Sequence, residues 1–147
     1  MDSNRIKSFR FKQTTWQEDR DEILTIRHRV FMIEQHFTDS ILCDVLDPNC
    51  FHIIVRNSEG SVVASGRLSP QGRIGRLAVL LPFRGVGIGS KILLDLVQIG
   101  KSNKLKNISL SAELDNRHFY DSKEFAANGP VYMKQGVPHQ VLTRKLA

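Results

Sequence analysis

The chain has 147 residues, of which 41% are hydrophobic and 24% charged, with a formal net charge of +6 at pH 7. These values are ordinary for a soluble globular protein, and the length suits one domain over residues 1–147. The positive charge favours an anionic ligand, but the basic residues are scattered, so nucleic acid is not expected as a partner.

The two cysteines, Cys43 and Cys50, form no C-x-x-C motif, and the five histidines pair with neither at ligand spacing. We therefore expect reduced thiols and no metal site. Residues 1–10 carry no apolar signal segment, and no stretch approaches the length of a membrane span. These features predict a cytoplasmic protein without a membrane partner.

The first elements are predicted from alternation and capping signals. Residues 8–12 alternate aromatic and polar side chains, which indicates a short strand that begins near Arg5. Thr15 and Glu18 form a capping box, and the helical spacing of apolar residues then continues to about Gln35. Residues 38–49 show no clear period and are predicted to be a loop, with a short helical turn around 41–45.

The middle of the chain is predicted to be a meander of three antiparallel strands. They are residues 51–57, 61–68 and 74–81, joined by turns at 58–60 and 69–72.

Residues 73–100 form the most informative stretch of the chain. A β-rich run ends at Pro82, three glycines follow at positions 85, 87 and 89, and helical spacing begins at Ile88. The first N–H groups of such a helix have no partner in the chain and, with the helix dipole, favour an anion. Arg84 adds a positive charge beside them. We expect a phosphate site here rather than a turn that only packs a helix on a sheet.

Two common phosphate proteins do not fit this stretch. The chain has no G-x-x-x-x-G-K-[ST] motif, which excludes a P-loop. No acidic residue ends the next strand at the spacing of a dinucleotide fold.

The last third of the chain is predicted to contain a strand over 107–112 and a helix over 116–125 capped by Asp115. Two final strands, 129–134 and 139–145, follow. The strand, helix and strand from 74 to 112 form a βαβ crossover, so these two strands should run parallel with a right-handed connection. The expected architecture is α+β around one mixed sheet.

Several motifs resemble the GNAT N-acetyltransferase superfamily. Residues 84–89, RGVGIG, match its R/Q-x-x-G-x-G/A loop. The small bacterial ElaA-like branch is matched further by 27–35 (RHRVFMIEQ), by 76–89 (RLAVLLPFRGVGIG) and by 136–139 (GVPH). Phe119 and Tyr120 fall where that branch has F-Y.

The resemblance implies a GNAT-type fold, a mixed and mostly antiparallel sheet flanked by helices with a β-α-β acetyl-CoA-binding core. It implies acetyl-CoA as cosubstrate, with the backbone of residues 77–79 on the pantetheine arm and the amides of 85–90 on the pyrophosphate. An N–H of Leu77 or Val79 would polarise the thioester. The expected cofactor-binding residues are Leu77, Ala78, Val79, Arg84, Gly85, Val86, Gly87, Ile88, Gly89, Ser90, Phe119 and Tyr120.

The resemblance also suggests catalytic residues. Tyr120 is the candidate general acid for the leaving thiolate, since the matched position places a hydroxyl beside the sulfur. Glu113 and Glu34 are the candidate bases. Each also has a structural interpretation: Glu113 as a surface residue at a strand end, and Glu34 as the ion-pair partner of Arg27 or Arg76.

Three further residues are candidates for acceptor binding. Arg27 and Arg76 could recognise an acidic group of the acceptor or could pair with nearby carboxylates. His139 could act as a base or shape the acceptor pocket. The aspartates of the 38–49 loop hint at a cationic acceptor such as a polyamine, although surface aspartates are common in loops.

Two positions depart from the ElaA-like pattern. Ala112-Glu113 stands where the branch usually has Ala-Gln, which places a carboxylate near the expected active site. Glu124-Phe125 stands where it usually has Gly-Phe, which weakens the glycine stop of the helix.

The expected function is therefore transfer of an acyl group, most simply acetyl, from acyl-CoA to the amine of a small molecule or peptide. Alternatives are a CoA-binding sensor or partner module without catalysis, and an acyltransferase like the acyl-homoserine-lactone synthases. A homodimer is an option because many relatives are dimers.

Overall fold

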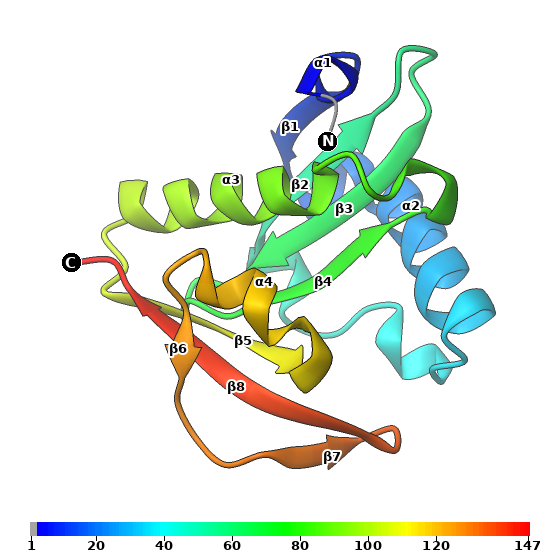
Figure 1. Cartoon of the computed structure of the whole chain (residues 1–147). Coiled ribbons are helices and arrows are strands. Elements are labelled where there is room, and N and C mark those ends of the chain that lie inside the picture. Colours follow the sequence, from blue (N-terminus) through cyan, green and yellow to red (C-terminus); the bar gives the residue numbers. More distant parts are fainter. Residues whose placement is uncertain (1–2) are drawn as a thin grey trace.

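The computed structural model describes residues 3–147, and its first sheet has the strand order β1-β2-β3-β4, all antiparallel (Figure 1). These strands are β1 (Arg10–Thr14), β2 (Phe51–Arg56), β3 (Val62–Leu68) and β4 (Ile74–Val79). The predicted meander is confirmed. The predicted strand start near Arg5 is wrong, because α1 (Ser3–Ile6) precedes β1 and Ser8 N–H closes a turn on Arg5 O.

Two helices cover the opposite faces of this sheet, as Figure 1 shows: α2 (Trp16–Arg27) on one side and α3 (Ile88–Ser102) on the other. Neighbouring residues of β2 alternate between the two layers. Ile54 packs in the cluster with Trp16 and Ile23 of α2. Ile53 and Val55 pack in the cluster that contains the buried face of α3.

The capping residue predicted for α2 is confirmed, because Thr15 Oγ1 accepts a hydrogen bond from Glu18 N–H at 3.2 Å. The helix continues as a π-helical segment, η1 (His28–Glu34), in which wider turns carry it to the predicted end near Gln35. We call His28–Glu34 the π segment.

The loop from 38 to 49 contains 3₁₀ turns at η2 (Asp39–Ile41) and η3 (Asp47–Asn49), not a turn around 41–45. Aspartate side chains explain this difference. Asp47 accepts a hydrogen bond from Asp44 N–H, and Asp44 accepts one from Leu46 N–H, both at 3.0 Å. Such side-chain bonds compete with helical pairing of the backbone.

The second sheet is antiparallel and has β8 at its centre. Its strands are β5 (Asn107–Glu113), β6 (Ala126–Ala127), β7 (Tyr132–Lys134) and β8 (Val137–Lys145). The short β6 was not predicted. β8 begins two residues earlier than expected, because Gln135 and Gly136 both have positive φ and make a two-residue hairpin turn.

The two sheets meet where β4 and β5 begin, through a parallel bridge between Arg73 and Ser109. Ser109 N–H donates to Gly72 O at 2.8 Å. A Cβ on Gly72 would lie 2.5 Å from Asn107 O, so the close approach requires glycine. The predicted parallel direction is confirmed, and the architecture is α+β. Beyond the bridge β4 and β5 diverge, so the sheet is split rather than continuous.

The last helix is shorter than predicted. It consists of a 3₁₀ turn, η5 (Leu114–Asn116), followed by α4 (Arg117–Asp121), so Asp115 lies inside the turn and does not cap the helix. Phe125 N–H bonds Tyr120 O and Glu124 N–H bonds Asp121 O, which together form a Schellman motif. Glu124 has φ +68°, so it adopts the left-handed conformation at the position where the sequence departs from the glycine of the ElaA-like pattern.

Candidate active site

The glycine loop between β4 and α3 leaves its backbone open. Gly85 (φ +84°) and Gly87 (φ +98°) are left-handed, and Gly87 caps α3 without any side-chain hydrogen bond. Val86 and Ile88 are buried and anchor the loop, whereas no atom lies within 4 Å of a Cβ built on Gly85 or Gly89. The free N–H groups at the start of α3 therefore face open space, as an anion site requires.

A cavity of about 410 Å³ adjoins this loop, which we call the loop cavity. It brings together most of the residues expected to bind the cofactor: Leu77, Ala78, Val79, Arg84, Gly85, Gly87, Ile88, Gly89, Ser90 and Phe119. Val86 instead faces the core, and Tyr120 lies in the neighbouring cavity. Val30, Phe83 and Gln35 also line it but were not selected as site residues from the sequence, although Val30 and Gln35 are specified positions of the matched 27–35 motif.

Arg84 does not extend freely over the loop. Its Nη1 and Nη2 donate to the two carboxylate oxygens of Glu34, both at 2.7 Å, and its Nε donates to Val79 O at 2.8 Å. The predicted pairing of Glu34 with Arg27 or Arg76 is therefore wrong. The hydrogen bonds from Arg84 lower the pKa of Glu34, so the carboxylate remains charged and is a weak proton acceptor.

A β-bulge interrupts β4 at the edge of the loop cavity. Ser65 pairs with Ala78 and Arg67 pairs with Gly75, so Arg76 and Leu77 together oppose Gly66. Gly66 permits this packing, since a Cβ there would lie 2.8 Å from the Leu77 side chain. Arg76 takes the left-handed conformation with φ +53°. Bulges re-aim side chains, and this one directs Arg76 into the space between the sheets.

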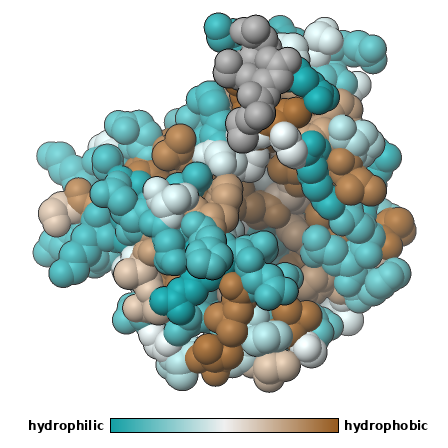
Figure 2. Space-filling view, in the orientation of Figure 1, coloured by the Kyte–Doolittle hydropathy of each residue, from teal (hydrophilic) through white to brown (hydrophobic). Residues whose placement is uncertain are grey.

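That space is a second cavity of about 310 Å³, between the diverging strands β4 and β5, which we call the splay cavity. It contains five of the predicted site residues: Arg76, Leu77, Glu113, Tyr120 and His139. Leu77 and Gln35 line both cavities, so the two adjoin. In the space-filling view of the same side as Figure 1, apolar residues are recessed toward the middle and polar residues form most of the rim (Figure 2).

Tyr120 is held at the splay cavity by the Schellman turn. Its ring packs edge-on against Phe125 with centroids 6.1 Å apart, and Phe125 is buried in the core. Burial, and then the negative charge of Glu113, raise the pKa of Tyr120. The phenol therefore stays protonated and can donate a proton.

Glu113 and His139 are cross-strand partners at the end of β5 and the start of β8. His139 is buried, and its Nδ1–H donates to Val137 O at 2.8 Å, which leaves Nε2 as the free nitrogen. Glu113 is exposed and has no ion pair within the part of the chain that the structure describes. Its carboxylate is therefore available to accept a proton.

Arg27 does not belong to either cavity, so the expectation that it binds the acceptor is wrong. Its side chain is 1% exposed, and both terminal nitrogens donate to Asp47 at 3.0 Å. Nη1 also donates to Leu42 O at 2.8 Å. Burial disfavours the charged form of Asp47, yet hydrogen bonds from Arg27 lower its pKa overall, so this is a buried structural ion pair.

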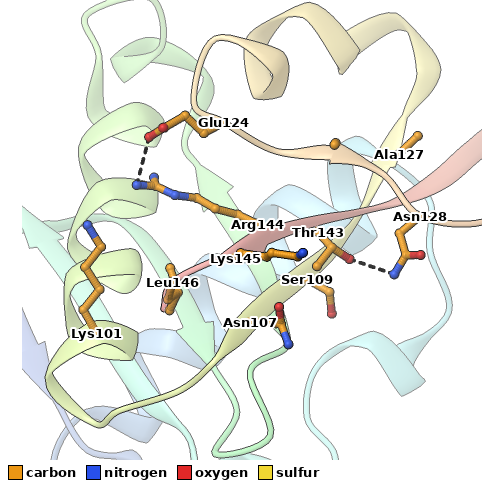
Figure 3. Close-up of a pocket in the computed structure, with 11 residues that line it drawn as sticks. Lys101, Asn107, Ser109, Glu124, Ala127, Asn128, Thr143, Arg144, Lys145 and Leu146 are labelled. Carbon is orange, nitrogen blue, oxygen red and sulfur yellow. Dashed lines mark hydrogen bonds and ion pairs between the residues drawn. The ribbon is translucent and has the colours of Figure 1, made fainter.

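A larger cavity, of about 800 Å³, lies at the far end of the second sheet (Figure 3). Several of its polar side chains are already paired with one another. Arg144 forms an ion pair with Glu124 at 3.0 Å, and Asn128 donates a hydrogen bond to Thr143 at 3.1 Å. The cavity contains neither the glycine loop nor any predicted site residue. We therefore place the active site in the loop and splay cavities.

Within the described residues, no group of three or more His, Cys, Asp or Glu side chains could hold a metal ion. No helix in residues 3–147 has the length and apolar character needed to cross a membrane.

The chain thus has an α+β fold with a glycine loop at the start of its central helix and a split between two central strands. The family model described as "Acetyltransferase (GNAT) domain" matches residues 18–146. The chain belongs to this GNAT acetyltransferase family, and the predicted resemblance is confirmed. Membership of this family supports acyl-CoA-dependent acyl transfer as the kind of reaction.

Individual proteins are similar to the chain in sequence or in fold. The chain is 30% identical over 142 residues to the uncharacterised protein YyaT of Bacillus subtilis, a match that covers 92% of this chain and 95% of YyaT. The crystal structure of Escherichia coli ElaA is similar in fold, with a TM-score of 0.83 and 22% identity over 93% of this chain and 99% of ElaA. A GNAT family acetyltransferase from Elizabethkingia anophelis, solved with acetyl-CoA bound, has a TM-score of 0.70 at 14% identity, covering 95% of this chain and 99% of that one.

Proposed function

We propose that the protein transfers an acetyl group from acetyl-CoA directly to the primary amine of a small molecule or peptide. The observation that carries the proposal is the junction of the two cavities at Leu77. One cavity holds the open glycine loop, and the other holds the half-buried phenol of Tyr120 beside the unpaired carboxylate of Glu113.

The loop cavity fits the cosubstrate. Left-handed glycines keep side chains away from the amides of Gly85 to Ser90, so a pyrophosphate can reach them. The backbone of Leu77 to Val79 lines the same cavity and would bind the pantetheine arm. When bound, acetyl-CoA supplies an activated thioester at the entrance to the splay cavity.

In the splay cavity we assign proton transfer to two residues. Glu113 accepts a proton from the amine as its nitrogen bonds to the acetyl carbon. As the C–S bond breaks, Tyr120 donates its proton to the departing sulfur. Glu34 is not assigned as the base, because its carboxylate is tied to Arg84. Holding the amine beside the thioester supplies much of the rate enhancement.

The first test is calorimetric titration of acetyl-CoA and CoA into the native protein and into Gly87→Trp. We expect binding to the native protein and none to the variant, because an indole at the cap of α3 blocks the loop. Folding of the variant is checked by circular dichroism. Absence of binding to the native protein would sink the proposal.

The second test separates an enzyme from a CoA-binding module. Release of free CoA is measured with a panel of amines for the native protein, Tyr120→Phe and Glu113→Gln. We expect turnover that both substitutions reduce strongly while acetyl-CoA affinity is kept. Tight acetyl-CoA binding without turnover of any amine would favour the binding module.

A further inference from the structure

The charges of the splay cavity identify the kind of acceptor it suits, on the basis of the proposed acyltransferase function. Its lining carries the cationic side chains Arg67, Arg73, Arg76 and Lys134. The only carboxylate among its lining residues is that of Glu113. An acceptor that is purely cationic would meet a surplus of positive charge in this cavity.

The aspartates that hinted at a polyamine offset the charge of Arg67 but not that of Arg73 or Lys134. Asp47 is fully buried and is shared by Arg27 and Arg67. Asp44 accepts two hydrogen bonds from Arg67 at 2.8 Å, and these lower its pKa to about 2. Both carboxylates are therefore taken up by arginines, and neither lines the cavity.

Among the three arginines that pair with Asp44 or Asp47, Arg76 has the longest ion pair. Its Nε donates to Ile41 O at 3.0 Å, which fixes the direction of the side chain. Its contact with Asp44 is long, at 3.4 Å, and its side chain is 20% exposed. Burial and the neighbouring charge of Arg67 lower the pKa of Arg76, as expected for a cation without a sufficient counter-ion.

The backbone supports a functional role for Arg76. Its φ of +53° is unfavourable for a residue with a Cβ, and glycine would avoid that cost. Strained residues of this kind gather at functional sites, where the surrounding structure holds them in place. Here the bulge and the bond to Ile41 hold an arginine fork, which suits a planar carboxylate, in a narrow cleft.

Two other cations face the cavity without a partner. Arg73 lies immediately before β4 and Lys134 lies at the end of β7, and neither forms an ion pair in the described chain. Glu113 and Arg76 lie on opposite strands of the split, each a few residues beyond the Arg73–Ser109 bridge. The first sheet thus offers the cations Arg73 and Arg76, and the second sheet offers Glu113 as a base together with the cation Lys134.

We propose that the acceptor is an amine that also carries a carboxylate, as in an amino acid or short peptide, and that Arg76 binds this carboxylate. Arg73 and Lys134 contribute positive charge around it. The amine then lies on the side of Glu113 and Tyr120, where proton transfer is assigned.

The test compares acceptors that differ only in the carboxylate. CoA release is measured with L-phenylalanine, L-phenylalaninamide and phenethylamine, and with L-lysine and cadaverine. We expect kcat/KM to be at least about tenfold higher for the amino acids, the size of a charge-assisted hydrogen bond. The amine of L-phenylalaninamide is less basic than that of L-phenylalanine and is more often neutral, which by itself would make the amide the better acceptor. A preference for the amino acid therefore cannot arise from amine basicity.

Substitutions in the splay cavity test which residues produce the preference for a carboxylate. Arg76→Gln should raise KM for the amino acids about tenfold more than it raises KM for phenethylamine. Lys134→Gln removes an exposed, unpaired cation and should raise the same KM by a few fold, which keeps the test usable if Arg76→Gln folds poorly. Lys106→Gln, an exposed lysine outside both cavities, is the matched control.

The outcomes separate this inference from the function on which it rests. Equal use of amino acids and their carboxylate-free counterparts, or a preference for cadaverine, overturns the inference and leaves the acyltransferase intact. Acetyl-CoA binding without turnover of any amino acid also overturns it. Failure to bind acetyl-CoA at all overturns the proposed function first, and the inference with it.

Discussion

Glu34 and Arg84 form a bidentate ion pair that joins the π segment to the glycine loop, with both N···O distances at 2.7 Å. The residues are 50 positions apart in the sequence, so the pair fixes how the helix end lies against the loop. It also occupies the carboxylate that the sequence offered as a base.

Glu34→Gln should therefore leave kcat nearly unchanged. Each side chain of the pair is 35% exposed, so its loss should reduce the free energy of unfolding by about 1 kcal/mol or less. The freed charge of Arg84 should tighten acetyl-CoA binding slightly at low salt. Steady-state kinetics and calorimetry check this. A fall in kcat of the size expected for loss of a general base, about 100-fold or more, would contradict the assignment to Glu113.

Gly85 and Gly60 offer a matched pair for testing the loop. Both have φ +84° and open space around the Cβ position, but Gly60 lies in the distant β2–β3 hairpin. Alanine at either position should lower the free energy of unfolding by a similar amount, about 1 kcal/mol, because the left-handed conformation is unfavourable. Only Gly85→Ala should weaken acetyl-CoA binding by calorimetry. Equal affinity of the two variants would argue against the loop as the phosphate site.

The raised pKa of Tyr120 should determine how kcat depends on pH in the alkaline range. Its pKa lies above the ordinary value of 10.0, raised by burial and then by Glu113, so the proton-donating form persists as the pH rises through 10. We expect kcat to show no alkaline loss below about pH 10, and Tyr120→Phe to lower it about 100-fold. Tyr132→Phe, which removes a phenol that bonds Ser111, is the control. An unchanged kcat in Tyr120→Phe would show that the leaving sulfur needs no acid from this residue.

The sequence was sufficient for features that follow from local pattern. Thr15 caps α2, the meander pairs as predicted, and the glycines of the loop lie at the turn from strand to helix, because each depends on residues close in sequence. Phe119 and Leu77 also line the loop cavity together with the glycines.

Features set by distant partners were not predictable in this way. The pairing of Glu34 with Arg84 joins residues that are 50 positions apart. The burial of Arg27 against Asp47 depends on how the loop 38–49 packs, for which the sequence has no period. The bulge at Arg76 carried no glycine to mark its left-handed backbone. The helix was predicted to continue to residue 125, whereas α4 ends at Asp121, because Glu124 is not a residue type that marks a helix end in a sequence.

Glu124 should be a position at which glycine stabilises the fold. With φ +68° it is the left-handed residue of the Schellman motif that ends α4. Glu124→Gly relieves this conformation but loses the ion pair between the exposed Glu124 and the half-buried Arg144, and it adds flexibility to the unfolded chain. The net gain in unfolding free energy should be about 0.5–1 kcal/mol, measured by denaturant titration. Glu124→Gln, which loses the ion pair alone, should show no gain; a gain there would point to charge rather than backbone.

Asp47 should make the protein sensitive to acid. Asp47 and Arg27 are 0% and 1% exposed, and Asp47→Asn leaves Arg27 charged and without its partner, which should cost about 3–5 kcal/mol of unfolding free energy. The pKa values of Asp47 and Asp44 are both lowered in the folded state. Their contribution is therefore complete above the unfolded pKa, near 4, and is lost as the pH falls through the folded values, about 2 for Asp44.

Denaturant titrations between pH 2 and 7 measure this dependence. We expect the native protein to lose stability progressively below about pH 4 and Asp47→Asn to show a shallower loss, because one of the two linked carboxylates is gone. Asp115→Asn, an exposed residue in η5 without an ion pair in the described chain, is the control. The control should keep the native pH dependence. If Asp47→Asn also keeps the native pH dependence, the acid sensitivity arises elsewhere, and the Arg27–Asp47 pair does not link folding to pH.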